Sequence, residues 1–185
     1  MLEPVLTDAD ARMKKSIEAA MHEFSTVRTG RANPSLVEGL KVEYYGTTVP
    51  LSQVAAVSVP EPRQLEIKPW DKGAIQGIER AIHESKLGLT PMNDGKVIRL
   101  NIPALTEERR KDLVKVVKQM AENHRVGVRN VRREAVEQVR ELVKKQSLSE
   151  DEKKRAEEKI QKITDASVAK IDELAAGKEK EILTV

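Results

Sequence analysis

The stretch from Thr106 to Gln146 constrains the fold more than any other part of the sequence. Apolar side chains recur along it every three or four residues, without a proline, which predicts a single amphipathic α-helix that starts at the Thr106 cap. At 1.5 Å per residue this helix would be about 60 Å long, so it needs long partners to bury its apolar face. That face consists of Leu113, Val116, Val117, Met120, His124, Val128, Val131, Ala135, Val139 and Leu142.

Two other segments have the pattern to supply those partners. The first is expected to start at a cap residue, Thr7 or Asp8, and its apolar face holds Met13, Ile17, Ala20, Met21, Phe24 and Val27. In the second, Ser149 and Glu152 predict a capping box, and the apolar face holds Ile160, Ile163, Val168, Ile171, Leu174 and Ala175. Three such faces can close one antiparallel-type helix bundle.

The pattern between the first two helical segments is different. "LKVEYYGTTVPL" alternates around Gly46 and predicts a hairpin, and "QVAAVSVPEPRQLEIKPW" predicts two more strands joined at Pro60–Glu61–Pro62. Asp71 is expected to cap a short helix that ends near Gly88, and "NDGKVIRLNIP" predicts a turn and a last strand, Val97 to Ile102. We therefore expect a small unit of four or five strands and one helix.

These segments predict an α+β protein in which a long antiparallel three-helix bundle, residues 1–29 and 106–185, is interrupted by an inserted β/α/β domain, residues 30–105. Gly30 is expected to end the first helix in a left-handed cap, and Pro34 prevents the helix from continuing. Two short crossings side by side are typical of a hinge. The predicted hinge residues are Gly30, Arg31, Ala32, Asn33, Pro34, Pro103, Ala104 and Leu105.

Composition narrows the possible functions. The chain has no cysteine, and its three histidines are far apart in the sequence; that of the long helix lies on the apolar face. No GxxxxGK[ST] motif is present, no apolar run is long enough to span a membrane, and the N-terminus does not resemble a signal peptide. We expect a cytoplasmic protein with no catalytic site, no metal site and no cofactor.

Positive charge is concentrated on one face of the long helix. Between Thr106 and Gln146 there are twelve Lys and Arg against seven Asp and Glu, and four arginines fall between Arg125 and Arg133 with no acid among them. Long solvated helices often carry charged stripes. Here, however, the arginines would repel one another unless an anion compensates, and the guanidinium fork suits phosphate. The sequence therefore favours a polyanion, RNA, as the partner of this cluster.

Two further features allow more than one interpretation. Gly127 interrupts the helix near its apolar side, which favours close helix packing over close approach of a ligand. Tyr44 and Tyr45 are adjacent in a strand, so they are expected on opposite faces with one of them exposed, and Trp70 ends another strand. Packing inside the small domain is favoured for these aromatic residues over RNA stacking.

The motifs "RTGRANPSL", "VEYYGTTVPLSQVA", "KPWDKGAI", "IHESKLGLTPMNDGKVIRLNIPALTEERRKDLVK" and "RVGVRNVRREA" extend over most of the chain. Through them the sequence closely resembles the bacterial ribosome recycling factor family. The resemblance implies an L-shaped molecule that binds the post-termination 70S ribosome across the A and P sites, with the bundle along large-subunit ribosomal RNA. It also implies that elongation factor G with GTP then drives subunit splitting by pushing on a mobile small domain.

By motif, RNA-contacting arginines of that family correspond to Arg110, Arg129 and Arg132. Position and charge add Arg28, Arg31, Arg125 and Arg133 to this set. We expect a monomer, because the apolar faces can be satisfied inside the bundle. The alternative function is a helical-hairpin adaptor or chaperone that acts through protein–protein contacts, in which the arginines are only a solvated face.

Overall fold

A computed structural model describes residues 2–184 and divides the chain into two compact units. One unit contains the chain up to Arg28 together with Glu107–Thr184, and the other contains Thr29–Thr106. The first unit holds three long helices, α1 (Glu3–Thr26), α4 (Glu107–Gln146) and α5 (Glu150–Leu183). The second unit holds all the strands that the structure describes and the shorter helices.

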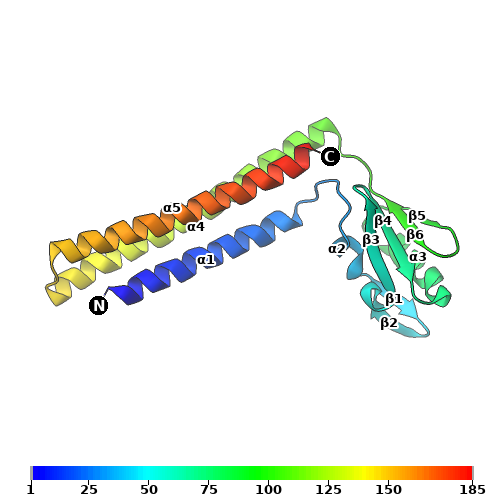
Figure 1. Cartoon of the computed structure of the whole chain (residues 1–185), viewed down its shortest axis with the longest axis horizontal. Helices are drawn as coiled ribbons and strands as arrows, with labels where there is room; N and C mark the ends of the chain where they lie inside the picture. The colour runs from blue at the N-terminus through cyan, green and yellow to red at the C-terminus, as the bar shows by residue number, and fades with distance from the viewer. Residues whose placement is uncertain (1, 185) are drawn as a thin grey trace. The chain divides into compact units, whose positions relative to one another are not determined.

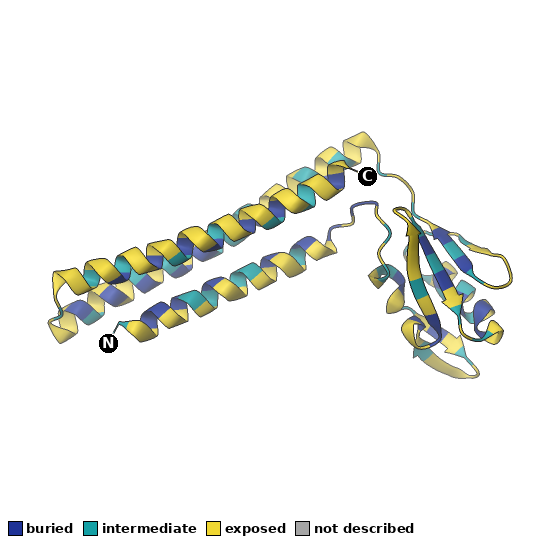
Figure 2. Ribbon diagram, in the orientation of Figure 1, coloured by how far each residue is buried: buried dark blue, intermediate teal, exposed yellow. Residues whose placement is uncertain are grey.

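The three long helices pack lengthwise against one another, with α1 and α5 antiparallel to α4 (Figure 1). Buried positions recur along one side of each helix, and exposed positions occupy the other sides (Figure 2). The predicted apolar faces are largely confirmed, with Met13, Val117 and Ile160 inaccessible to solvent. Met21 and Val116 are exceptions, because they remain 51% and 42% exposed at the edges of the stripes.

The ends of the helices differ in part from the predictions. The capping box at Ser149 and Glu152 is confirmed: the serine hydroxyl accepts from the Glu152 N–H, and the glutamate carboxylate accepts from the Ser149 N–H. The predicted start of α1 at Thr7 or Asp8 is wrong, because the helix begins at Glu3 with a proline in its first turn. Proline fits there because the first-turn N–H groups have no partner inside the helix.

The second unit is built around two antiparallel sheets. β1 (Lys41–Tyr44) and β2 (Thr47–Pro50) form the predicted hairpin. The other sheet has the order β3-β4-β6-β5, from β3 (Ala55–Glu61), β4 (Gln64–Pro69), β5 (Pro91–Asn93) and β6 (Ile98–Asn101). The strand β5 and the one-turn helix α2 (Ser35–Glu38) were not predicted, because each has too few residues to show a periodic pattern.

Helix α3 (Ile75–Glu84) completes the core of this unit and ends one turn before the predicted stop near Gly88. The core is aliphatic: Val37, Leu51, Leu65, Ile67, Ile78, Ile98 and Leu100 are all inaccessible to solvent. Gly77 lets α3 approach β1 closely, since a Cβ at this position would lie 2.3 Å from the Glu43 carbonyl oxygen. The small unit therefore has a complete hydrophobic core of its own.

Candidate nucleic-acid interface

Helix α4 carries the arginines that the sequence singled out. Arg125, Arg129, Arg132 and Arg133 are separated by four, three and one residues, so the helix displays them along one side. Arg125 and Arg132 are half-buried, whereas Arg129 and Arg133 are exposed. The structure thus brings these four side chains together beside α5, and we call them the arginine cluster.

Acidic residues inside the molecule neutralise part of this cluster. Glu122, one turn earlier, accepts hydrogen bonds from Arg125 (2.8 Å) and Arg129 (3.0 Å), and Asp172 on α5 accepts another from Arg125. The hydrogen bonds from Arg125 and then Arg129 lower the pKa of Glu122, and Asp172 followed by Glu122 raises the pKa of Arg125. The argument that the cluster needs an external anion to offset its repulsion is therefore wrong for these two arginines.

The other two members have no carboxylate partner among residues 2–184. Arg132 donates from Nη1 to the side-chain oxygen of Gln161 on α5 at 3.0 Å, so its hydrogen-bond partner is a neutral group. Arg133 has no hydrogen bond or ion pair with any residue that the structure describes. The positive charge available to an incoming anion is therefore concentrated on Arg132 and Arg133.

The remaining candidate arginines lie away from this cluster. Arg28 follows the last turn of α1 and is exposed, and Arg110 lies in the first turn of α4. Because α1 and α4 are antiparallel, both belong to the same end of the bundle. The Nε of Arg110 is buried and lacks a hydrogen-bond partner in the described chain. Arg31 is exposed but belongs to the second unit.

The expected close packing at Gly127 is wrong. A Cβ added there would meet no atom within 4 Å, although the residue lies in the middle of α4 between Arg125 and Arg129. Glycine in a helix interior costs about 1 kcal/mol relative to alanine, and no helix contact in the bundle requires it. The structure leaves room beside the arginine cluster at this position.

The aromatic residues of the small unit also differ from the prediction. Tyr44 and Tyr45 do not diverge: both hydroxyls donate to Oδ2 of Asp71, at 3.1 and 2.9 Å. The strand ends at Tyr44, and Tyr45 adopts a left-handed backbone with φ of 47°, which redirects its side chain. Tyr45 is 77% exposed and Tyr44 is half-buried, so the expectation that one of the two tyrosines is exposed is confirmed. Trp70 is 68% exposed, so the expected interior packing is wrong for this residue.

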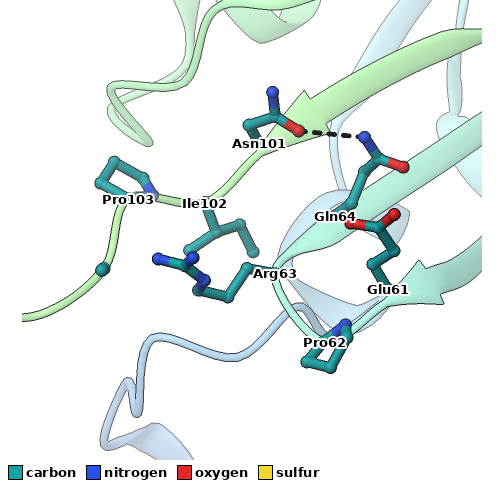
Figure 3. Close-up of a pocket in the computed structure, with 8 residues that line it drawn as sticks. Glu61, Pro62, Arg63, Gln64, Asn101, Ile102 and Pro103 are labelled. Carbon is teal, nitrogen blue, oxygen red and sulfur yellow. Dashed lines mark hydrogen bonds between the residues drawn. The ribbon is translucent and has the colours of Figure 1, made fainter.

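The two segments that connect the units are fixed to the same β-turn. The N–H of Ala32 donates to the Pro62 carbonyl, and the N–H of Ile102 donates to the Arg63 carbonyl, both at 2.8 Å. Figure 3 shows this turn beside Ile102 and Pro103, lining a pocket with the hydrogen-bonded Gln64 and Asn101 side chains.

The segments also contact each other within the second unit. Gly30 has a φ of +79°, and a Cβ there would lie 3.1 Å from Cγ of Leu105. The left-handed conformation predicted for Gly30 is present, but α1 ends at Thr26, so Gly30 is part of the connection and not the helix cap. The two connecting segments therefore lie against each other at Gly30 and Leu105.

Residues 2–184 contain no group of three or more His, Asp or Glu side chains that could bind a metal ion. No helix in this range is both long and apolar enough to cross a membrane. His124 contacts Glu23 through Nε2 and lies edge-on to Phe24, so it joins α1 to α4.

Comparison with known proteins decides the family. The sequence profile described as "Ribosome recycling factor" matches residues 20–183. The chain belongs to the ribosome recycling factor family. A ribosome-recycling factor from Nitratidesulfovibrio vulgaris (strain DP4) is 56% identical over 184 residues, covering 100% of this chain and 99% of that protein. Another, from Thermus thermophilus, is 53% identical over 182 residues, covering 98% of both chains.

Solved structures of ribosome recycling factors share the fold. A solution structure of the ribosome recycling factor is 48% identical, with a TM-score of 0.76 over 100% of this chain and 98% of that one. A structure with 53% identity and a TM-score of 0.64 covers 99% of both chains. It describes the T. thermophilus ribosome recycling factor and the E. coli elongation factor G bound to the E. coli post-termination complex. The α+β architecture predicted from the sequence is confirmed.

Proposed function

We propose that this protein is a translation factor that binds the post-termination 70S ribosome and, with elongation factor G and GTP, splits it into subunits for recycling. The observation that carries the proposal is the full-length similarity to a ribosome recycling factor seen with elongation factor G on the post-termination complex. The GTP is hydrolysed by elongation factor G, and this protein is not an enzyme. It acts in the cytoplasm as a monomer.

Ribosomal RNA is contacted by the bundle through arginines. Arg132 and Arg133 supply most of the attraction, because no carboxylate within the described chain neutralises them. Arg125 and Arg129 are held in place by Glu122 and contribute less net charge. Arg110 and Arg28 extend the contact to the other end of the bundle, and Arg31 adds a contact from the connecting segment.

The small unit moves relative to the bundle during splitting. The proposed hinge comprises Gly30–Pro34 on one connection and Pro103–Leu105 on the other. Since Ala32 and Ile102 are hydrogen-bonded to the β3–β4 turn, rotation is concentrated at Gly30–Arg31 and at Pro103–Leu105. Elongation factor G pushes on the small unit while the arginines hold the bundle on RNA.

Light scattering of post-termination ribosomes mixed with this protein, elongation factor G and GTP tests the function. We expect a decrease in scattering that requires both factors, with an initiation factor present to block reassociation. Arg132→Ala should weaken binding and lower the dependence of log affinity on log salt by about one unit. Arg155→Ala, on α5 outside the cluster, removes the same charge and should leave the slope unchanged.

The two parts of the proposal fail in different ways. A decrease that Arg132→Ala leaves intact would keep the recycling function and overturn the role of that arginine. No decrease with the wild-type protein and a matched elongation factor G would instead support the adaptor alternative.

A further inference from the structure

Three arginines of α4 form side-chain hydrogen bonds to α5, and we call this series of bonds the ladder and each bond a rung. One rung differs chemically from the other two. Arg140 pairs with Glu157 at 3.0 Å, and Arg125 pairs with Asp172, so both of these rungs join a guanidinium to a carboxylate. The rung between them joins Arg132 to the neutral side chain of Gln161. The arginines on both sides of Arg132 thus bond a carboxylate of α5 directly, whereas Arg132 bonds a neutral amide and reaches the carboxylate of Asp165 only through Gln161.

Gln161 is itself held by a second residue of α5. Its Nε2 donates to Oδ1 of Asp165, one turn later, at 2.7 Å. An amide has one accepting and one donating end. Because Asp165 occupies the donating end, the oxygen of Gln161 is turned toward Arg132, and the guanidinium receives a fixed acceptor without a formal charge.

A neutral acceptor has a different consequence from a carboxylate. A glutamate at this position would hold Arg132 as well, but it would also cancel the charge that attracts phosphate. With Gln161 in place, one N–H of the guanidinium is used to fix the side chain, and no other protein group among the described residues competes for the rest. Arg132 is therefore oriented, and no carboxylate among the described residues is hydrogen-bonded to it.

We infer that Gln161 is a positioning residue for ribosomal RNA binding: with Asp165 it orients Arg132 and keeps its charge available to a phosphate. This inference rests on the proposed function, since it assigns a role to a side chain that supports the RNA-binding arginine. Gln161 acts through Arg132, and the phosphate contact itself belongs to the arginine.

Two substitutions separate orientation from charge. Gln161→Glu retains an acceptor and adds a negative charge, so we expect weaker ribosome binding and a salt slope lower by about one unit, as for Arg132→Ala. Gln161→Ala removes the acceptor without changing the charge. It should weaken binding by about two- to tenfold through lost side-chain ordering, with the wild-type salt slope.

The measurement is co-sedimentation with 70S ribosomes over a salt series. The matched control is Gln119→Glu, because Gln119 forms the same kind of i, i+4 side-chain bond, to Asn123, on α4. It lies about 20 Å along the helix from Arg132, beyond the Debye length of about 10 Å at 0.1 M salt. We expect no change in slope for this control.

The thermal unfolding midpoint distinguishes a positioning role from a general loss of stability, because only a loss of stability lowers the midpoint together with ribosome binding. Gln161→Glu gains an ion pair with Arg132 but loses the hydrogen bond to Asp165 and places a second carboxylate beside it. We therefore expect a midpoint near the wild-type value together with weaker ribosome binding. In the Arg132→Ala background, both Gln161 substitutions should have no further effect on binding, as expected for residues that act through one contact.

Three results would overturn the inference. The first is that Gln161→Glu binds ribosomes as well as the wild type. The second is that Gln161→Glu and Gln119→Glu change ribosome affinity equally. The third is that the effects of Gln161→Glu and Arg132→Ala on affinity add in full in the double variant. Failure of the wild-type protein to sediment with ribosomes would overturn the proposed function and this inference with it. The wild-type measurement alone reveals that outcome, so it is distinguishable from the other three.

Discussion

Asp71 organises the most constrained group of side chains in the small unit. Its carboxylate accepts from the Gly73 N–H at 3.0 Å and from the hydroxyls of Tyr44 and Tyr45. These bonds, with that from Gly73 the largest contribution, lower the pKa of Asp71 below its ordinary 3.8, and the same contact raises the pKa of both tyrosines. The Tyr45 hydroxyl thus reaches Asp71 from a left-handed backbone conformation, which is uncommon outside glycine.

The titration of Asp71 provides a prediction for single residues. A carboxyl group with a depressed pKa in the folded state stabilises that state above its unfolded pKa, and the contribution is lost as the pH falls through the folded pKa. The chemical shift of the Gly73 amide proton should therefore titrate below pH 3.8. Tyr45→Phe should raise this midpoint but leave it below 3.8, because the bond from Gly73 remains.

The Asp71→Asn protein is the control for the residue prediction. It should lack this titration, and the stability of its small unit should fall less than that of the wild type as the pH drops toward the folded pKa of Asp71. The same loss of stability with pH in both proteins would contradict the assigned role of the carboxylate.

Among the helices, α4 and α5 each contain a glycine that no packing contact explains. A Cβ at Gly127 or at Gly177 would meet no atom within 4 Å. Replacing either glycine with alanine should therefore raise the free energy of unfolding by about 0.5–1 kcal/mol, because alanine reduces the backbone entropy lost on folding. Denaturant unfolding of each variant measures this effect.

The two glycines differ in what surrounds them, which makes Gly177 a matched control. Gly127 lies within the arginine cluster, whereas Gly177 lies in the last two turns of α5. If close approach of RNA is the reason for Gly127, Gly127→Ala should weaken ribosome binding and Gly177→Ala should not. Equal binding by both variants would remove that explanation.

The long helices could be predicted from the sequence because their signals are local. The recurrence of apolar residues every three or four positions predicted α1, α4 and α5, and the capping-box pattern of Ser149 and Glu152 predicted the start of α5. The pairing of Arg125 with Asp172 could not be predicted, because it depends on the relative register of two helices and joins residues 47 positions apart. The conformation of Tyr45 was missed for a related reason, since its hydroxyl binds a residue 26 positions away.

For the whole molecule, the question is how two compact units act together through two short connections. Each unit has its own hydrophobic core, and the connections contact each other where Leu105 lies against Gly30. Both are fixed to the β3–β4 turn through Ala32 and Ile102. The few residues outside these fixed points are therefore the ones where the proposed rotation must occur.

The last prediction concerns these residues. Ala104→Pro restricts the backbone between two fixed points, so we expect it to slow ribosome splitting while leaving binding to ribosomes near the wild-type level. Gly30→Ala should act in the same direction, because alanine is disfavoured at a φ of +79° and would press on Leu105.

Splitting is measured by light scattering with elongation factor G and GTP, and binding by sedimentation without them. Ala104→Ser serves as the control, since it changes the side chain without restricting the backbone. Equal losses of splitting and binding in Ala104→Pro would contradict the hinge. The slower splitting would then be explained by weaker ribosome binding alone, with no need for rotation between the two units.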